Sequence, residues 1–233
     1  MIPLHDNVPT LRFAYVTYVL IALNALVFIY ELTLGPQGLA QFFMQWGYVP
    51  ARVVDTVRTG TFAPSVLITL VTSIFIHGGW FHFLGNMLYL HIFGNNVEDS
   101  MGRFRFVLFY LLIGVVANLA QVAVASDSTV PGIGASGAIA GVLGAYLILY
   151  PRAGVLVLIP LLFIFPIVVL PAFVVLILWF VLQFFQGTFA LAAGVAGEGG
   201  VAFWVHVAGF VLGAGLIFAF RNRKLCRTKC TWV

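Results

Sequence analysis

Apolar runs of membrane-spanning length recur along the chain and are separated by shorter, more polar connections. An apolar helix of about 20 residues is long enough to cross the roughly 30 Å hydrocarbon core of a bilayer. The pattern therefore predicts six spanning helices, at about Phe13–Leu32, Trp80–Val97, Phe104–Val124, Ser136–Tyr150, Val168–Gln186 and Val201–Phe220.

The composition supports this interpretation. The chain is 62% hydrophobic and 8% charged, with a mean hydropathy of +1.10, whereas soluble domains carry roughly 25% charged residues. These values exclude an ordinary soluble protein and favour an all-α integral membrane protein with the lipid bilayer as its solvent. We expect residues 1–233 to form a single membrane domain. Nucleic-acid partners are not expected, because no basic stripe interleaved with aromatic residues is present.

The apolar segment Val155–Gln186 is longer than one span and contains three prolines. We interpret its first part as an interfacial or buried connector and its remainder as the fifth helix; a seventh span is the alternative. With six spans and a cytoplasmic N-terminus, nine basic residues lie inside and two outside, as the positive-inside rule requires. The inner set is Arg12, Arg103, Arg105, Arg152, Arg221, Arg223, Lys224, Arg227 and Lys229, and the outer set is Arg52 and Arg58. A seventh span would move the basic C-terminal tail, 221–233, to the outside; the short N-terminus, 1–12, is cytoplasmic in both cases.

The connection Thr33–Gly79 is long and rich in aromatic residues, so we expect it to fold on or partly into the outer leaflet; a floppy loop is the alternative. Cys226 and Cys230 lie in the basic tail and are interpreted as reduced thiols. No metal site is expected there, because no further ligand type lies close by.

Five polar groups gather at the predicted outer ends of the second, fourth and sixth helices: His77, His82, Asn86, Ser136 and His206. Such groups are costly at bilayer depth and are candidates for function, although single polar groups also link membrane helices by hydrogen bonds. The fourth helix is only about 22 Å long at 1.5 Å per residue. Because Pro151 and Arg152 fix its inner end, Ser136 must lie below the outer surface, and we predict a water-filled cavity there.

Small residues surround these groups at helical spacing. Gly134 and Gly137 permit a tight backbone beside Ser136. Gly137 with Gly141, Ala140 with Gly144, and Gly209 with Gly213 are pairs that allow helices to approach closely. Close approach of the fourth and sixth helices is what a hydrogen bond between Ser136 and His206 requires.

A serine nucleophile with a histidine base is the chemistry that these residues predict. Ser136 stands at a helix N-terminus, which favours a developing oxyanion, and His82 and Asn86 could supply further donors. Apart from Glu31, near the end of the first predicted span, no Asp or Glu lies in the membrane segments to orient His206, and the spacing of Asp127 and Glu198 in outer loops does not favour that role. We therefore predict a Ser–His dyad. His91, deeper in the second helix, is expected to make an interhelical hydrogen bond.

At these residues the chain resembles the rhomboid family of intramembrane serine proteases. The motifs that carry the resemblance are Gly134-x-Ser136-Gly137, His77-x4-His82-x3-Asn86 and His206-x2-Gly209-x3-Gly213, and the start Met1-Ile2-Pro3-Leu4 is similar to bacterial members. The resemblance implies a six-helix rhomboid-like bundle with a long, partly embedded first outer loop, in a bacterial inner membrane.

The resemblance also implies cleavage of single-span membrane proteins in or near their transmembrane segments, without a cofactor or metal. It implies that Ser136 is the nucleophile and His206 the base. It also implies that His82, Asn86 and the Ser136 backbone N–H stabilise the oxyanion. The fifth helix and the following loop, Gly187–Gly200, would form a lateral gate with the second helix. No oligomeric state is predicted.

Two positions depart from the family pattern. Some relatives carry an aromatic residue, packed on the histidine, where this chain has Ala140; a Trp-Arg pair found in some first loops is replaced by Trp46-Gly47. Two alternatives stay open: a non-enzymatic membrane binder on the same fold, and a metal-dependent hydrolase or transporter that uses His77, His82 and His206. The chain has no His-Glu-x-x-His run to support the latter.

Overall fold

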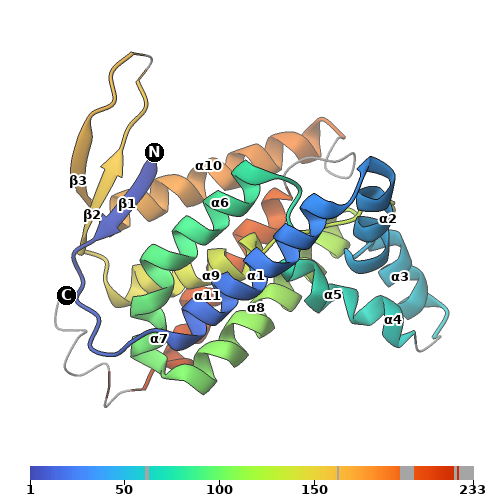
Figure 1. Cartoon of the computed structure of the whole chain (residues 1–233), viewed down its shortest axis with the longest axis horizontal. Coiled ribbons are helices and arrows are strands. Elements are labelled where there is room, and N and C mark those ends of the chain that lie inside the picture. The colour runs from blue at the N-terminus through green and yellow to red at the C-terminus, as the bar shows by residue number, and fades with distance from the viewer. Residues whose placement is uncertain (61–62, 162, 195–201, 223–224, 226–233) are drawn as a thin grey trace.

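The computed structural model describes residues 1–60, 63–161, 163–194, 202–222 and 225, and it is a helical bundle with a small sheet at one end (Figure 1). Its helices are α1 (Tyr15–Thr33), α2 (Pro36–Trp46), α3 (Pro50–Arg58), α4 (Pro64–Leu67), α5 (Thr69–Thr72), α6 (Trp80–Tyr89), α7 (Asn95–Met101), α8 (Arg103–Val124), α9 (Ser136–Leu149), α10 (Ala172–Ala192) and α11 (Phe203–Phe220). A 3-10 turn (Ser73–Phe75) precedes α6, and a π-helical turn (Leu90–Gly94) joins α6 to α7. The strands are β1 (Ile2–Asp6), β2 (Gly154–Leu158) and β3 (Ile167–Pro171).

The helical membrane fold is confirmed. Within the described residues, α1, α8, α10 and α11 are each long and apolar enough to span a bilayer. The α6–α7 helix, Trp80–Met101, is bent by 78° against the preceding Pro64–Phe75 segment, and α9 is a shorter apolar helix. Each expected segment thus has a helix. The count of six spans stays a prediction, because α6–α7 qualifies only together with the bent segment before it and α9 is too short to qualify.

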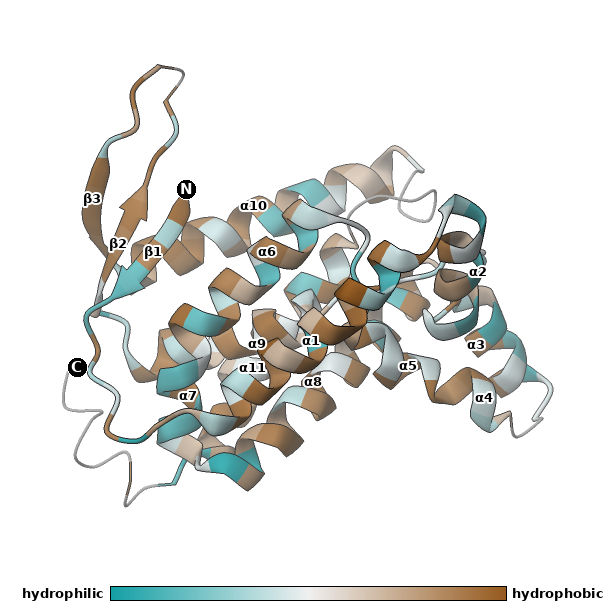
Figure 2. Cartoon of the chain, in the orientation of Figure 1, coloured by the Kyte–Doolittle hydropathy of each residue, from teal (hydrophilic) through white to brown (hydrophobic). Residues whose placement is uncertain are grey.

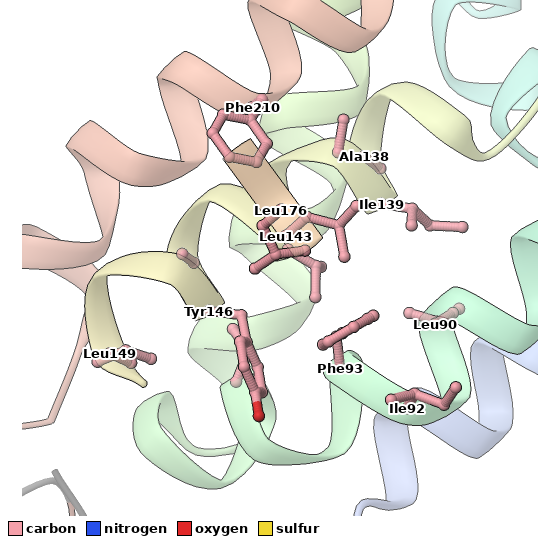
Figure 3. Packing of buried hydrophobic residues seen from close by; sticks show 14 of the residues in the cluster. Leu90, Ile92, Phe93, Ala138, Ile139, Leu143, Tyr146, Leu149, Leu176 and Phe210 are labelled. Atoms are coloured by element: carbon pink, nitrogen blue, oxygen red, sulfur yellow. The ribbon is translucent and has the colours of Figure 1, made fainter. Parts of the chain in front are cut away.

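Helix α9 lies at the centre of the bundle, and residues from Gly137 to Tyr146 are all buried. Aromatic and aliphatic side chains of the π-turn, α10 and α11 pack around it, among them Phe93, Leu176 and Phe210 (Figure 3). A central helix that is apolar on every side has no wet face. The pattern of burial therefore places the N-terminus of α9, where Ser136 stands, inside the protein.

The glycine positions lie where α9 meets α11. A Cβ on Gly213 would lie 1.9 Å from the carbonyl oxygen of Gly141, and one on Gly209 would lie 2.1 Å from that of Gly137. A Cβ on Gly144 would lie 2.0 Å from the oxygen of Phe210. The two backbones are therefore in direct contact, which is closer than larger residues would permit.

The sheet is a feature that the sequence analysis did not anticipate. Its order is β1-β2-β3, antiparallel throughout, with Ile2 opposite Leu158 and Val157 opposite Val168. The segment taken as a connector is therefore a hairpin, and α10 begins at Ala172 rather than Val168. The short N-terminus contributes the strand β1 to the same sheet. The seventh-span alternative is wrong, because strands occupy the region where that span would lie.

Polar groups fasten the N-terminal segment to α7 at this same end. The Glu98 carboxylate accepts from the backbone N–H groups of Val16 and Thr17 at 3.0 and 2.7 Å, which caps the start of α1. Asp99 pairs with Arg12 at 3.2 Å. These buried acids fix where the first spanning helix enters the bundle.

The Thr33–Gly79 connection is folded over its described part, so the floppy-loop alternative is wrong. It contains α2 to α5, and in Figure 1 α2, α3 and α4 lie at the end of the bundle opposite the sheet. Thr72 donates to the carbonyl of Trp46 at 2.6 Å, and Asn118 of α8 donates to the carbonyl of Leu70 at 2.9 Å. This packing makes the connection a support for the helices beside it; its position in the outer leaflet stays a prediction.

Candidate active site

Ser136 is the first residue of α9, and the turn before it is held from the first connection. Gly134 adopts φ +126°, a conformation that favours glycine, and donates its N–H to the carbonyl of Ser73 at 2.9 Å. Tyr48 exchanges backbone hydrogen bonds with Gly132, and its ring covers that glycine so closely that a Cβ there would lie 2.2 Å from Cζ. Burial raises the pKa of Tyr48, so its phenol stays neutral. The turn is thus fixed before the helix begins.

The structure brings Ser136 and His206 together. The Oγ of Ser136 lies 2.8 Å from Nε2 of His206, which projects from the first turn of α11. Gly137 permits this approach, because a Cβ at that position would lie 2.4 Å from the side chain of Val205. A hydroxyl donating to an imidazole nitrogen at this distance is the arrangement in which a histidine can remove the serine proton.

Helix α10 contributes two side chains to His206 that the sequence analysis missed. The Oε1 of Gln183 lies 2.5 Å from Nδ1 of His206, and the ring centroid of Trp179 lies 5.8 Å from that of the imidazole. Trp179 therefore places an aromatic ring beside the histidine, although the chain has alanine at position 140. Gln183 carried a signal that could have been used: it is a polar residue within an apolar run, as His206 is.

His82 and Asn86 both lie on α6 and both line the cavity at Ser136. The ring of His82 lies against Gly134, so that a Cβ there would be 2.7 Å from His82 Nε2 and 3.6 Å from Ser136 Oγ. The Nδ2 of Asn86 is buried and has no hydrogen-bond partner within the described structure. An unsatisfied buried donor is costly, and here it faces the space beside the nucleophile.

His77 lies one layer behind these residues and does not line the cavity. Its buried backbone N–H donates to Oε1 of Glu31 at 3.1 Å, and its ring meets that of His82 at 5.1 Å between centroids. His77 thus packs against the ring of His82 and supports its position. Exposed Asp127 lies in the connection after α8, and Glu198 falls outside the described residues, as do Cys226 and Cys230. His91 packs its ring on Tyr18 of α1, at 5.8 Å between centroids, rather than at the site.

A cavity of about 760 Å³ contains the reacting groups. Side chains of α6, α9, α10 and α11 line it, together with Tyr48 and the turn before Ser136. Its size suits an extended peptide segment or a drug-sized molecule. Over the described part of the chain, no group of three or more His, Cys, Asp and Glu residues is arranged to hold a metal ion.

Comparison with known proteins gives one family. The model of the Rhomboid domain matches residues 64–223. The chain is 44% identical over 71 residues to Rhomboid-like protein 11, chloroplastic, of Arabidopsis thaliana, and the match covers 30% of this chain and 25% of that protein. It is 36% identical over 78 residues to Putative rhomboid protease YdcA of Bacillus subtilis, covering 34% of this chain and 39% of the relative.

Rhomboid protease GluP of Bacillus subtilis is 42% identical over 78 residues, which cover 34% of this chain and 15% of GluP. The chain thus matches well under half the length of each of these relatives. The family match is far more extensive, since it runs from α4 through the turn at Ser136 to the end of α11. On that match, the chain belongs to the rhomboid family of membrane proteins.

Proposed function

We propose that this protein is an intramembrane serine endopeptidase that cleaves single-span membrane proteins in or near their transmembrane segments. The observation that carries the proposal is the 2.8 Å contact between Ser136 Oγ and His206 Nε2 in a cavity large enough for a peptide. Family membership supports the same activity, because rhomboid proteins are typically serine intramembrane proteases.

The reaction follows from the positions of the groups. Ser136 Oγ attacks the scissile carbonyl while His206 Nε2 takes its proton. The negative charge that develops on the carbonyl oxygen is met by the Ser136 backbone N–H at the start of α9, the Asn86 side-chain amide and His82. His206 then gives its proton to the leaving amine, and water entering the cavity hydrolyses the acyl-enzyme.

The membrane arrangement supports access from one side. Under the positive-inside rule both termini of the chain are cytoplasmic. The cavity lies at the N-terminal end of α9, which then faces the outside of a bacterial inner membrane. Helix α10 is the least buried of the four long apolar helices in the described structure. We propose that a substrate helix enters from the lipid between α6 and α10.

Replacement of the nucleophile tests the function directly. Ser136→Ala should lower cleavage of tagged single-span proteins to background, about 10⁴-fold or more, because the covalent step is lost. His206→Ala should do the same. Cut sites are mapped by mass spectrometry, and thermal unfolding serves as the control for folding. Cleavage that persists in Ser136→Ala contradicts the nucleophile assignment.

Covalent labelling separates the protease from its alternatives. A fluorophosphonate should label the parent protein at Ser136 and leave Ser136→Ala unlabelled. A membrane binder on the same fold would show no labelling and no cleavage. A metal-dependent hydrolase would lose activity when a chelator is added, whereas the proposed mechanism predicts no loss of activity.

A further inference from the structure

Helix α10 contributes a hydrogen-bond partner and an aromatic ring to the histidine that meets Ser136. Trp179 and Gln183 are four residues apart and so project from one side of the helix. The first packs beside the imidazole, and the second lies 2.5 Å from its Nδ1. The base is therefore assembled from two helices, α11 and α10, rather than from α11 alone.

The hydrogen-bond pattern requires a particular tautomer. For Ser136 to donate its hydroxyl proton to Nε2, that nitrogen must be unprotonated, and the proton of a neutral imidazole must then be on Nδ1. The carbonyl oxygen of Gln183 accepts that proton. A neutral amide can thus orient the imidazole in this chain, since the two ring nitrogens of His206 meet the Gln183 amide and the Ser136 hydroxyl rather than a carboxylate.

We propose that Gln183, with Trp179 beside it, is a positioning residue that holds His206 in the tautomer and ring orientation that can accept the Ser136 proton. The inference rests on the proposed function. Since α10 is the least buried of the long apolar helices, its displacement by an entering substrate would remove both contacts, so the base is complete only while α10 is seated against α11.

The kinetic test uses the full chain in lipid vesicles with a tagged single-span substrate. Gln183→Leu should lower kcat by about 10- to 100-fold and leave KM nearly unchanged, because the wrong tautomer cannot take the proton. Gln183→Glu keeps an acceptor at the same distance and should recover most of that loss. Thr188→Val, on the exposed side of the same helix, is the matched control and should keep the parent kcat.

A spectroscopic test needs no activity. In protein labelled with ¹⁵N-histidine, the His206 signals of the parent should report a protonated Nδ1, and those of Gln183→Leu should shift toward the other tautomer; His206→Ala assigns them. Parent kcat and an unchanged tautomer in Gln183→Leu would overturn the positioning role alone. Cleavage that does not depend on Ser136 would instead overturn the proposed function, while the tautomer measurement would still decide the role of Gln183.

An independent observation concerns the hairpin between β2 and β3. From Ala153 to Leu182 no residue has a charged, hydroxyl or amide side chain. At the hairpin tip Phe163 is 92% exposed and Ile164 68%, and both strands are apolar in Figure 2. An exposed apolar patch of this kind marks a surface that contacts a membrane or another protein.

The position of the hairpin favours a membrane, rather than another protein, as the partner of this apolar surface. Strand β3 passes directly into α10, whose exposed side continues the apolar surface through Phe173 and Ile177. The hairpin projects sideways from the bundle end opposite α2 and α3 (Figure 1). Strand β3 is one edge of the sheet, and its unpaired backbone groups cannot lie in hydrocarbon without partners. In a shallow position in the headgroup region, water and headgroups can pair with the backbone of β3 while the apolar side chains at the tip reach the acyl chains.

We infer that this hairpin rests in the leaflet at the end of the bundle opposite Ser136 and anchors the start of α10 there. The test uses Phe163→Cys in a chain with Cys226→Ser and Cys230→Ser, labelled with an environment-sensitive fluorophore and reconstituted in phosphatidylcholine vesicles. The label should emit at short wavelength and be quenched by lipids that carry a nitroxide near the top of the acyl chain.

Thr10→Cys, an exposed polar position near the same end, is the matched control and should show long-wavelength emission with little quenching. Equal, weak quenching at positions 163 and 10 would overturn the inference. Efficient disulfide cross-linking between copies of the unlabelled Phe163→Cys protein, together with no lipid quenching of the labelled protein, would overturn it in favour of a second copy of this chain as the occupant.

Discussion

At the scale of single residues, the site consists of polar groups that would be costly in lipid and are useful only together. Ser136 and His206 are satisfied by each other, and Gln183 completes the imidazole. Asn86 differs, because the buried Nδ2 of its amide has no hydrogen-bond partner in the described structure. In the proposed mechanism its partner is the oxyanion, which exists only during the reaction.

This assignment predicts the effect of changing Asn86. Asn86→Ala should lower kcat by about 10²- to 10³-fold, as loss of one oxyanion donor does, with little change in KM. Asn86→Asp keeps the shape but removes the donors, so it should lose at least as much. Steady-state cleavage of a single-span substrate measures both, and an Asn86→Asp variant with parent kcat would exclude the side chain from the oxyanion site.

At the scale of helices, the contact between α9 and α11 determines the distance between nucleophile and base. The backbones touch at Gly141 and Gly213, where an added Cβ would lie 1.9 Å from a carbonyl oxygen. Backbone atoms cannot yield as a flexible side chain can, so the helices would have to separate. Because Ser136 and His206 sit at the N-terminal ends of these two helices, separation would also lengthen their contact.

Gly213→Ala should therefore destabilise the protein by about 1–3 kcal/mol and reduce cleavage. Gly215→Ala on the same helix has open space around its Cβ position and should leave stability unchanged or slightly raised. Thermal unfolding in detergent, followed by tryptophan fluorescence, compares the two. Equal Tm values for the two variants would contradict close packing as the role of Gly213.

At the scale of the whole molecule, the two ends of the bundle have different structural roles. One end has the folded connection of α2 to α5, which supports the turn before Ser136 through Ser73 and Tyr48. The other end has the sheet and the buried acids that fix α1 to α7. The central helix α9 joins them, so the site is supported from outside the spans as well as within them.

The helices and the polar residues of the site could be found in the sequence, because hydrophobic length and the rarity of polar groups in lipid are local properties of the chain. The sheet could not: an apolar run with prolines and β-branched residues does not by itself distinguish a strand from a buried helix. Its pairing also depends on Ile2–Asp6, about 150 residues away in the chain.

By itself the sequence determined the membrane environment, the helical framework and the identity of Ser136, His206, His82 and Asn86 as the candidate chemistry. Only the tertiary structure decided what holds His206, because Trp179 and Gln183 reach it through the packing of α10 on α11, and no spacing along one helix specifies which side chains a neighbouring helix will present.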